Sequence, residues 1–493
     1  MKFKVCDTHF PAAWVGVEGL NLLRLDSRYY SPQYLKDDEL LNSELFEKKN
    51  IGQMAALVKD GPGGWAFKAN EYTTAGVPVI RASDLVHGLD LSNAVYMTEE
   101  KHQELKQSEC LPGDLVISVR GTTGRAAIIP NSVKKANLNA AVVRVRLKEK
   151  WLKSGQFITA FLNSSFGRRV TERIANGAVQ NNINLTEVRS IPVPIPDSRI
   201  QDYIGLKVEL AEKCREEANK LHRKMNEKVD EFLSQLGIPK IQDKETDQLT
   251  FFAESDELTN IRLDPKYYRP RFIFTVKNLT SVKHDFLENI ITNCNYGASV
   301  PSDYVDEGIP FIRGVDLVEN RILSGDICYL SSLLSNKVKR SRVNKNDILI
   351  TRSGSVGTTS VVTEKYDGYA FGSYMIRFSV NSNYNPFYIA SFLNSPYGKS
   401  QTERLRNGAV QENINLEEIG RIVIPWISRE AQDEVERLVR LWIDFSEKSI
   451  GFNTEAKSDV EALIEGKLDT DAIMSGKLKS PTWENIEKEL EGI

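Results

Sequence analysis

Cationic and polar side chains gather around two short turns bounded by glycines, and they are the groups here best suited to chemistry. One turn reads Gly121-Thr-Thr-Gly124-Arg125 and the other reads Arg352-Ser-Gly354-Ser-Val-Gly357. Glycines let a backbone come close to a phosphate, hydroxyls fix the register, and arginine grips guanine with two hydrogen bonds. Taken alone, the pattern fits recognition of nucleic acid and a plain tight turn between strands equally well.

Basic segments flank both turns. Between positions 115 and 148 there are no carboxylates and seven basic residues: Arg120, Arg125, Lys134, Lys135, Arg144, Arg146 and Lys148. The corresponding later segment has Asp347 as its only carboxylate and carries Lys337, Lys339, Arg340, Arg342, Lys345 and Arg352. A single charge run is typical of a solvated face, but its recurrence at the same place favours contact with a polyanion.

Amide-rich segments follow each basic region. Asn176-Gly-Ala-Val-Gln-Asn-Asn-Ile-Asn-Leu185 recurs almost unchanged as Asn407-Gly-Ala-Val-Gln-Glu-Asn-Ile-Asn-Leu416. Amides can read adenine edges or touch phosphate, and Asn also favours turns and caps. Residues identical in both copies cannot distinguish two target sequences, so we expect these segments to be structural or to contact the DNA backbone.

Base readout is therefore expected where the copies differ, and differing readers imply an asymmetric, two-part target. The candidate readers lie in Lys134 to Asn139, in Lys337 to Arg342 and in the two turns. The full set of candidate DNA-binding residues is Arg81, Arg120, Thr122, Thr123, Arg125, Lys134, Lys135, Asn137, Asn139, Gln180, Asn182, Arg313, Lys337, Lys339, Arg340, Arg342, Arg352, Ser353, Ser355, Gln411 and Asn413.

The whole sequence is built twice. Val77-Pro-Val-Ile-Arg-Ala-Ser-Asp-Leu85 recurs as Ile309-Pro-Phe-Ile-Arg-Gly-Val-Asp-Leu317, and Phe161-Leu-Asn-Ser recurs as Phe392-Leu-Asn-Ser. The period of about 230 residues far exceeds that of solenoid repeats, so each copy is expected to be a domain with its own core.

Composition narrows the class of protein. The chain has 493 residues, 41% of them hydrophobic, and a formal net charge of −3. Its five cysteines lie far apart, which disfavours a disulfide scaffold or a structural zinc site, and scattered histidines give no reason to expect a metal. No apolar stretch reaches the roughly 18 residues of a membrane span, and the start lacks the apolar core of a secretion signal. We expect a soluble, cytoplasmic protein.

Short β-branched runs bounded by Gly, Pro, Asn or charge predict strands in each copy. They are expected at 77–80, 115–119, 126–129 and 141–145, and again at 309–312, 347–351, 359–362 and 374–378. Apolar spacings of three and four predict one helix over 157–174 and another over 386–405. The prolines of Ile191-Pro-Val-Pro-Ile-Pro196 are expected to prevent a ladder or helix and to favour an extended exit.

Two long amphipathic helices are predicted, one after each copy. Apolar residues three and four apart run from Ser198 to Leu236 and from Arg429 to Leu468, with an expected interruption at Gly451. Each stripe needs an apolar partner, and the other helix, packed antiparallel, is the nearest candidate. About 36 helical residues would span roughly 54 Å and act as a rigid spacer. A further helix is expected to start at Ser480-Pro481 in the acidic tail.

These features together resemble the specificity subunit of type I restriction-modification enzymes. The resemblance covers essentially the whole chain and rests on the order of motifs: the strand before Arg81 or Arg313, the Gly-x-x-Gly turn, the Phe-Leu-Asn-Ser helix, the Asn-Gly-Ala-Val-Gln segment, the proline exit and the long helix. It implies a mixed α/β fold with two β-rich target recognition domains separated by two long antiparallel helices.

The resemblance also implies the partners and the boundaries. Each recognition domain would read one half of a split double-stranded DNA site, while the helices dock two adenine methyltransferase subunits and restriction subunits join the complex. No cofactor is expected in this chain, and S-adenosylmethionine is expected in the methyltransferase partner. The expected parts are recognition domains at 1–197 and 241–427, spacer helices at 198–240 and 428–468, and an acidic tail at 469–493.

Two motifs could instead indicate an enzyme. Asn385-Pro-Phe-Tyr388 partly matches the base-holding motif of amino methyltransferases, but the other copy lacks it and no methyl-donor turn accompanies it, so a helix start is the better interpretation. Asp90 with Glu99-Glu-Lys101 fits a loose nuclease spacing that chance also produces. Neither favours an enzyme. A stand-alone DNA-binding scaffold or regulator without enzyme partners remains the alternative.

Overall fold

The chain forms two compact units. The computed structural model describes residues 3–6, 12–17, 20, 24–42, 46–86, 88–175, 181–241, 250–252, 258, 262–323, 325, 327–408 and 412–490. One unit comprises Met1–Glu217 with Asp444–Gly492, and the other comprises Ala218–Ile443 with Ile493. Two long helices, α7 (Ser198–Gln235) and α14 (Arg429–Ile464), therefore each contribute one part to each unit. The units are called the first and second unit below.

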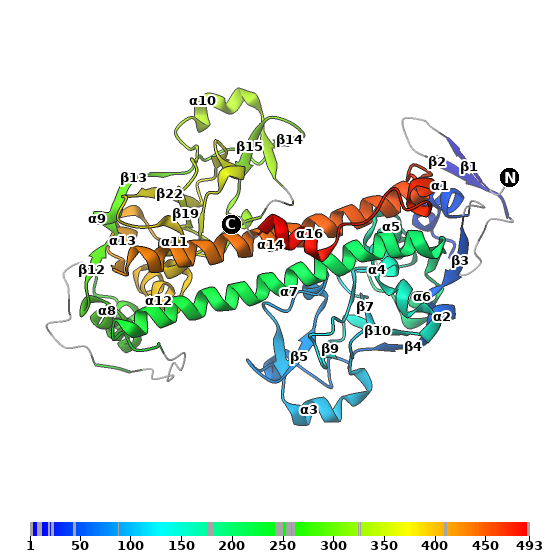
Figure 1. Cartoon of the computed structure of the whole chain (residues 1–493), viewed down its shortest axis with the longest axis horizontal. Helices are drawn as coiled ribbons and strands as arrows, with labels where there is room; N and C mark the ends of the chain where they lie inside the picture. The colour runs from blue at the N-terminus through cyan, green and yellow to red at the C-terminus, as the bar shows by residue number, and fades with distance from the viewer. Residues whose placement is uncertain are drawn as a thin grey trace. The chain divides into compact units, whose positions relative to one another are not determined.

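Both units contain the same four-stranded antiparallel sheet (Figure 1). In the first unit its order is β4 (Ala55–Asp60), β10 (Val142–Leu147), β7 (Leu115–Ser118) and β8 (Ala126–Ile128). In the second unit the order is β13 (Ile291–Tyr296), β22 (Met375–Val380), β19 (Ile348–Thr351) and β20 (Thr359–Val361). The strands predicted from the β-branched runs are confirmed, and the identical order shows that the repeat is a repeat of topology.

A second sheet is also repeated. It contains β5 (Val77–Ile80), β6 (Val95–Met97) and β9 (Asn137–Leu138) in the first unit. Its counterpart contains β15 (Ile309–Ile312), β18 (Cys328–Leu330) and β21 (Ala370–Phe371), with β14 (Tyr304–Val305) added at one edge. In both, the central strand has one antiparallel and one parallel neighbour. The mixed α/β class is thus confirmed, and much of it is β-sheet.

The helix predicted over 157–174 is two helices, and so is its counterpart over 386–405. The observed helices are α4 (Gly155–Asn163), α5 (Ser165–Ile174), α11 (Pro386–Asn394) and α12 (Pro396–Leu405). Ser164 and Ser395 are extended at the breaks, where each hydroxyl accepts a hydrogen bond from a backbone N–H of the next helix. Serine favours this capping position. Both helices of each pair bury an apolar face, so apolar residues continue at helical spacing across the break and the sequence suggested a single helix.

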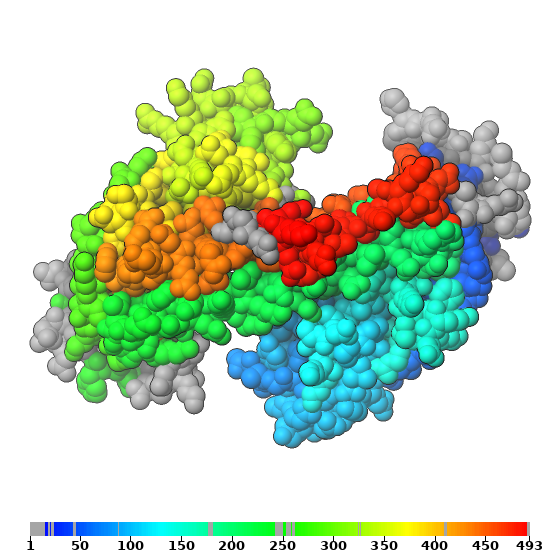
Figure 2. Space-filling model, in the orientation of Figure 1, coloured from blue at the N-terminus to red at the C-terminus, as the bar shows by residue number. Residues whose placement is uncertain are grey.

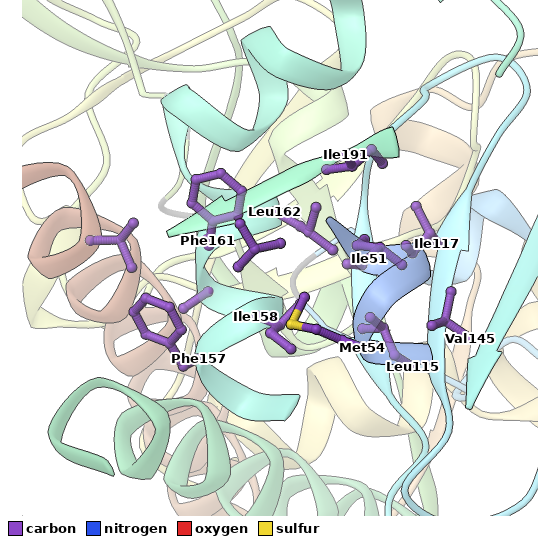
Figure 3. Close-up of a cluster of buried hydrophobic side chains, with 14 of the residues drawn as sticks. Ile51, Met54, Leu115, Ile117, Val145, Phe157, Ile158, Phe161, Leu162 and Ile191 are labelled. Carbon is purple, nitrogen blue, oxygen red and sulfur yellow. The ribbon is translucent and has the colours of Figure 1, made fainter. Parts of the chain in front are cut away.

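The core of the first unit lies between its helices and its four-stranded sheet. Figure 3 shows Phe157, Ile158, Phe161 and Leu162 of α4 gathered with Leu115 and other residues of the sheet side. The same cluster takes in residues from both long helices: Ile200, Ile204 and Val208 of α7, and Ala456, Val460 and Leu463 of α14. Burial of such side chains contributes roughly 1.5–3 kcal/mol each. The helices are therefore part of the domain core and not only an attachment to it.

The proline-rich exit forms a ladder, contrary to the prediction. β11 (Pro192–Ile195) pairs antiparallel with β3 (Glu47–Asn50), and β23 (Val423–Pro425) pairs likewise with β12 (His284–Phe286). Each of these sheets has only two strands, so every strand has one free edge. Proline is tolerated in such strands because its missing N–H can face away from the partner. The segment is extended, as predicted, but paired.

The two long helices pack antiparallel within each unit. In the first unit Lys207 pairs with Asp459 at 2.7 Å, and Arg215 reaches the Ser449 hydroxyl at 3.3 Å, so numbers rise along α7 as they fall along α14. In the second unit Lys228 lies 3.7 Å from Glu434, and the His222 ring stacks on Trp442. This confirms the predicted antiparallel pairing in both units.

Gly451 does not interrupt α14, which is continuous through that position. A glycine inside a helix costs roughly 1 kcal/mol relative to alanine. The neighbouring turns bury Ala456, Val460 and Leu463 in the core of the first unit, and this burial outweighs the glycine. The interruption was predicted from propensity alone, which tertiary packing overrides.

The C-terminal segment folds back onto the helices of the first unit. It contains α15 (Thr470–Met474) and α16 (Trp483–Leu490), so the helix begins just after the predicted start at Ser480-Pro481. Lys213 lies 3.9 Å from the centroid of the Trp483 ring, and Lys448 pairs with Glu489. Figure 2 shows this segment in red on the surface beside α7. Among the described residues, no helix has the length and apolar character needed to cross a membrane.

Candidate nucleic-acid interface

A side-chain hydroxyl at the end of a sheet strand holds each glycine-bounded turn together. In the first unit the Ser118 hydroxyl donates to the carbonyl of Thr122 at 2.6 Å and accepts from the Arg125 N–H at 3.0 Å. In the second unit the Thr351 hydroxyl donates to the carbonyl of Ser355 and accepts from the Thr358 N–H at 3.0 Å. The two turns are thus built by the same bonds from residues that the repeat places in register.

The second glycine of each turn is required by a helix. Gly124 has φ +82°, and a Cβ there would lie 2.1 Å from the Thr171 hydroxyl oxygen in α5. Gly357 has φ +96°, and its Cβ would lie 2.9 Å from the Thr402 hydroxyl oxygen in α12. Side chains at positive φ are strained, and these contacts add a steric cost. The predicted role, close approach to a phosphate, is not needed to explain these two glycines.

Backbone hydrogen bonds join each turn to two distant segments. In the first unit Val119 N–H donates to Ala141 at 2.8 Å, and Val119 accepts from Ile183 N–H at 3.0 Å. In the second unit Arg352 N–H donates to Tyr374 at 2.8 Å and Arg352 accepts from Ile414 N–H at 3.0 Å. Ile183 and Ile414, in the described parts of the amide-rich segments, therefore lie directly beside the residues that precede the turns.

We call this run of adjoining backbone the seam. In the first unit it comprises Ile80–Arg81, Asn139–Ala141, Val119–Arg120 and Asn182–Ile183. In the second unit it comprises Ile312–Arg313, Gly372–Tyr374, Arg352–Ser353 and Asn413–Ile414. Asn139 N–H donates to Ile80 at 3.0 Å, and Gly372 N–H donates to Ile312 at 3.0 Å, which joins the seam to the second sheet of each unit.

The candidate residues differ in accessibility. Those that are exposed are Arg120, Thr122, Lys134, Asn182, Lys337, Lys339, Arg340 and Ser355. Those that are half-buried are Arg81, Arg125, Lys135, Asn139, Arg313, Arg342, Arg352, Ser353 and Asn413. Gln180 and Gln411 lie outside the described residues.

Two candidates are buried and have no surface to offer a ligand. The Asn137 side chain donates to His102 and to the carbonyl of Leu105, and it accepts from the Leu138 N–H at 2.8 Å. Thr123 is 2% exposed. The Asn137 amide serves buried neighbours and Thr123 is covered, so we leave both out of the proposed contact set.

Arg81 and Arg313 are occupied by internal ion pairs. Arg81 grips Asp84 with its Nε at 3.1 Å and its Nη2 at 2.8 Å, and Arg313 holds Asp316 in the same way. These carboxylates raise the pKa of both guanidinium groups. Arg-x-x-Asp recurs in both copies, and each pair brackets a short helical turn. This spacing could have indicated from the sequence that the two residues form a structural ion pair.

The basic run of the first unit is only partly available to a polyanion. Arg146 binds Asp114 through two 2.7 Å hydrogen bonds, Lys135 binds Glu99, and Arg144 is 6% exposed. In the second unit Arg342 donates to the carbonyl of Gly368 at 2.7 Å. Lys148 and Lys345 are exposed but are bonded to the Gln53 carbonyl and to Glu364. The other exposed cations of the two runs are Arg120, Lys134, Lys337, Lys339 and Arg340.

Exposed aromatic residues beside the seam were missed in the sequence. Trp65 is 85% exposed in the loop after β4, where Gly61 N–H donates to Val142 at 3.1 Å and buried Phe67 anchors the other end. In the second unit Tyr374 is 58% and Tyr296 is 39% exposed. Glycines around Trp65 were the only local signal, because exposure of an aromatic side chain depends on tertiary structure.

The motifs considered for catalysis have structural roles. Asn385 caps α11, accepting from Phe387 N–H at 2.9 Å and donating to Asp433 at 2.9 Å and Glu436 at 2.6 Å. This confirms the predicted helix start. Asp90 accepts from the Ser92 N–H at 2.9 Å, close to its own place in the chain.

Comparisons with known proteins identify the family of this chain. A sequence model described as the type I restriction modification DNA specificity domain matches residues 43–220 and 293–438. The chain is 22% identical over 401 residues to the EcoBI type I restriction enzyme specificity subunit of Escherichia coli, which covers 76% of this chain and 75% of that protein.

Solved structures of similar description also match. The type I restriction-modification S subunit of M. genitalium gives a TM-score of 0.44 at 15% identity, covering 87% of this chain and 97% of that one. The HsdS subunit of Thermoanaerobacter tengcongensis gives 0.28 at 14% identity, covering 86% and 98%. The assignment rests on the two matched sequence regions, which span more than half of the chain. The chain therefore belongs to the family of type I restriction-modification DNA specificity subunits.

Proposed function

We propose that this chain selects a bipartite, asymmetric double-stranded DNA site, with one half contacted by each unit. It assembles with two adenine methyltransferase subunits and with restriction subunits, acts in the cytoplasm and brings their chemistry to the site. The chain is a DNA-recognition subunit and performs no catalysis itself. S-adenosylmethionine binds to the methyltransferase partner.

The duplicated seam is the observation that carries this proposal. Its backbone hydrogen bonds are the same in both units, but its side chains differ. The positions of Arg120, Val119 and Ala141 in the first unit are occupied in the second unit by Ser353, Arg352 and Tyr374, respectively. A common framework with different functional groups is what two readers of different sequences require. Direct readout depends on the pattern of donors, acceptors and methyl groups that each base pair presents.

The proposed contacts divide into two kinds. Exposed cations supply phosphate contacts, which position the protein and carry no sequence information. These are Lys134, Lys337, Lys339 and Arg340, which lie outside the seam. Seam and turn residues that differ between the units supply base contacts, among them Thr122 and Ser355. The identical Asn182 and Asn413 lie in backbone bridges to the seam and are proposed to orient it.

The long helices are proposed to set the distance between the two half-sites. We propose recognition domains at 1–197 and 241–427, with spacer segments at 198–240 and 428–468. Residues of α7 and α14 belong to the core of the first unit, so the helices and the recognition domain of that unit are packed together.

Mapping of modified adenines tests the proposal. The chain is produced with its methyltransferase partner, and DNA exposed to the complex is sequenced for methylated adenines. The expected motif has two defined parts, unrelated in sequence and separated by undefined base pairs. A methyltransferase that fails to copurify, or methylation without a two-part motif, would favour a stand-alone DNA-binding protein.

A further inference from the structure

We propose that Arg352, supported by the ring of Tyr296, reads a guanine in the half-site of the second unit. This inference rests on the proposed function and deepens it, since it names one base-reading residue and its positioning residue. Figure 1 shows β13, β22 and β19, the strands that carry or flank these residues, in one sheet of that unit.

The backbone of Arg352 is fixed on both sides. Its N–H donates to Tyr374 at 2.8 Å and its carbonyl accepts from Ile414 N–H at 3.0 Å. It directly follows Thr351, the last residue of β19, whose hydroxyl ties the turn. The Cα of Arg352 is therefore held by the sheet, the amide-rich segment and the turn together, so a change of its side chain leaves these bonds in place.

The guanidinium group stacks on an aromatic platform. Its Cζ lies 4.9 Å from the centroid of the Tyr296 ring. Tyr296 ends β13, and its hydroxyl accepts a hydrogen bond from the Leu416 N–H at 3.2 Å. A ring fixed at both ends limits the arginine to few rotamers. Preorganisation of this kind lowers the entropy lost when a ligand binds.

The ring, and no ion pair among the described residues, holds the guanidinium group of Arg352. Its Nε is buried and has no hydrogen-bond partner among the described residues, although a buried polar atom without a partner is costly. A cation–π contact uses the π face of the ring and takes up no oxygen or nitrogen acceptor. A ligand with two coplanar acceptors matches the planar N–H donors of a guanidinium group, and guanine offers O6 and N7 while a phosphate offers two oxygens.

Comparison of the units favours guanine over phosphate. Strand pairing places Asp60 of the first unit where Tyr296 stands in the second, and Val119 and Ala141 occupy the positions of Arg352 and Tyr374. Phosphates are present in both half-sites, so a phosphate contact would have a use in both units. An arginine and two tyrosines confined to one unit fit a contact specific to one half-sequence.

Methylation of a library tests the inference with matched variants. The complex with its methyltransferase partner acts on duplexes in which each position of the second half-site is varied in turn. Arg352→Lys is expected to lower discrimination for guanine at one position by about 5- to 150-fold, the range of a good bidentate contact. Discrimination in the first half-site is expected to stay unchanged.

Two variants of Tyr296 separate the platform from simple folding. Tyr296→Phe keeps the ring and removes only the hydrogen bond with Leu416, and it is expected to retain guanine discrimination. Tyr296→Ala is expected to lose it to nearly the extent of Arg352→Lys, with the first half-site again unaffected as an internal control of folding and assembly.

Each outcome decides between defined alternatives. Uniform weakening at every sequence, with a smaller salt dependence of binding, would show that Arg352 contacts a phosphate and would overturn the inference. Unchanged discrimination in Arg352→Lys would overturn it too, while a two-part motif in the native complex would leave the proposed function standing. Absence of any two-part motif in the native complex would instead overturn the proposed function.

Discussion

Replacement of the turn glycines by alanine separates backbone strain from contact with the neighbouring helix. Gly354 and Gly357 belong to the same turn and both have positive φ, +79° and +96°. A Cβ at Gly354 would have no atom within 4 Å, whereas one at Gly357 would lie 2.9 Å from the Thr402 hydroxyl oxygen. That hydroxyl donates to the carbonyl of Lys399 at 3.0 Å, which holds it in place.

The magnitudes follow from these contacts. An alanine at positive φ costs roughly 1–2 kcal/mol, which is the whole expected loss for Gly354→Ala. Overpacking adds about 1–3 kcal/mol, so Gly357→Ala is expected to cost about 2–5 kcal/mol of unfolding free energy. Gly124→Ala is expected to cost the most, because its Cβ would lie 2.1 Å from the Thr171 hydroxyl oxygen.

Urea unfolding of the full chain, followed by circular dichroism, measures the three losses. The expected order of destabilisation is Gly124→Ala, then Gly357→Ala, then Gly354→Ala. Equal losses at Gly354 and Gly357 would refute the steric account. Unaltered stability with weakened DNA binding for Gly357→Ala would show instead that this glycine serves a phosphate.

Three further outcomes are expected. Trp65→Ala should leave unfolding free energy within about 0.5 kcal/mol, since the side chain is 85% exposed. It should weaken DNA binding by the complex about tenfold, as truncation of a large aromatic side chain at an interface commonly does. Unchanged affinity would remove Trp65 from the interface. Burial against Trp442 lowers the pKa of His222 below its unfolded value of about 6.5. The contribution of neutral His222 to stability is therefore present above about pH 6.5 and is lost as the pH falls from there toward the folded pKa. His222→Phe should flatten the decline in melting temperature between about pH 7 and 5. An equally steep decline in the variant would exclude His222 as the cause. Charge reversal at exposed Lys339 and Arg340 should reduce the salt slope of DNA affinity by about 0.9 for each phosphate that the variant no longer neutralises, and an unchanged slope would place both side chains outside the interface.

Local sequence pattern predicted the strands and the long helices well. The runs that form β5, β7, β15 and β19 are rich in Val, Ile and Leu and are bounded by charged residues, Gly or Pro. The apolar pattern and the residues that bound it therefore indicated the same strands. The repeat made these predictions firmer, since each element was seen twice. The helix breaks at Ser164 and Ser395 were missed because a capping serine can also be accommodated inside a helix, and only the capping bond distinguishes the two.

Sequence alone did not indicate which candidate side chains are accessible. Asn137 and Arg120 have similar propensities for the surface, yet one is 0% exposed and bonded to His102 while the other is exposed. The seam depends on hydrogen bonds such as that from Ile183 to Val119, which join segments far apart in the chain. The platform under Arg352 likewise comes from a different strand, so neither arrangement leaves a local pattern.

The most direct test of the central claim is a chimaera with two copies of one recognition domain. Residues 241–427 are replaced by a copy of residues 1–197, the chain is assembled with its methyltransferase partner, and methylated adenines are mapped. If each unit reads its own half-site, both halves of the new motif carry the sequence that the first unit reads in the native complex. Retention of the native asymmetric motif by an assembled, active chimaera would contradict this account.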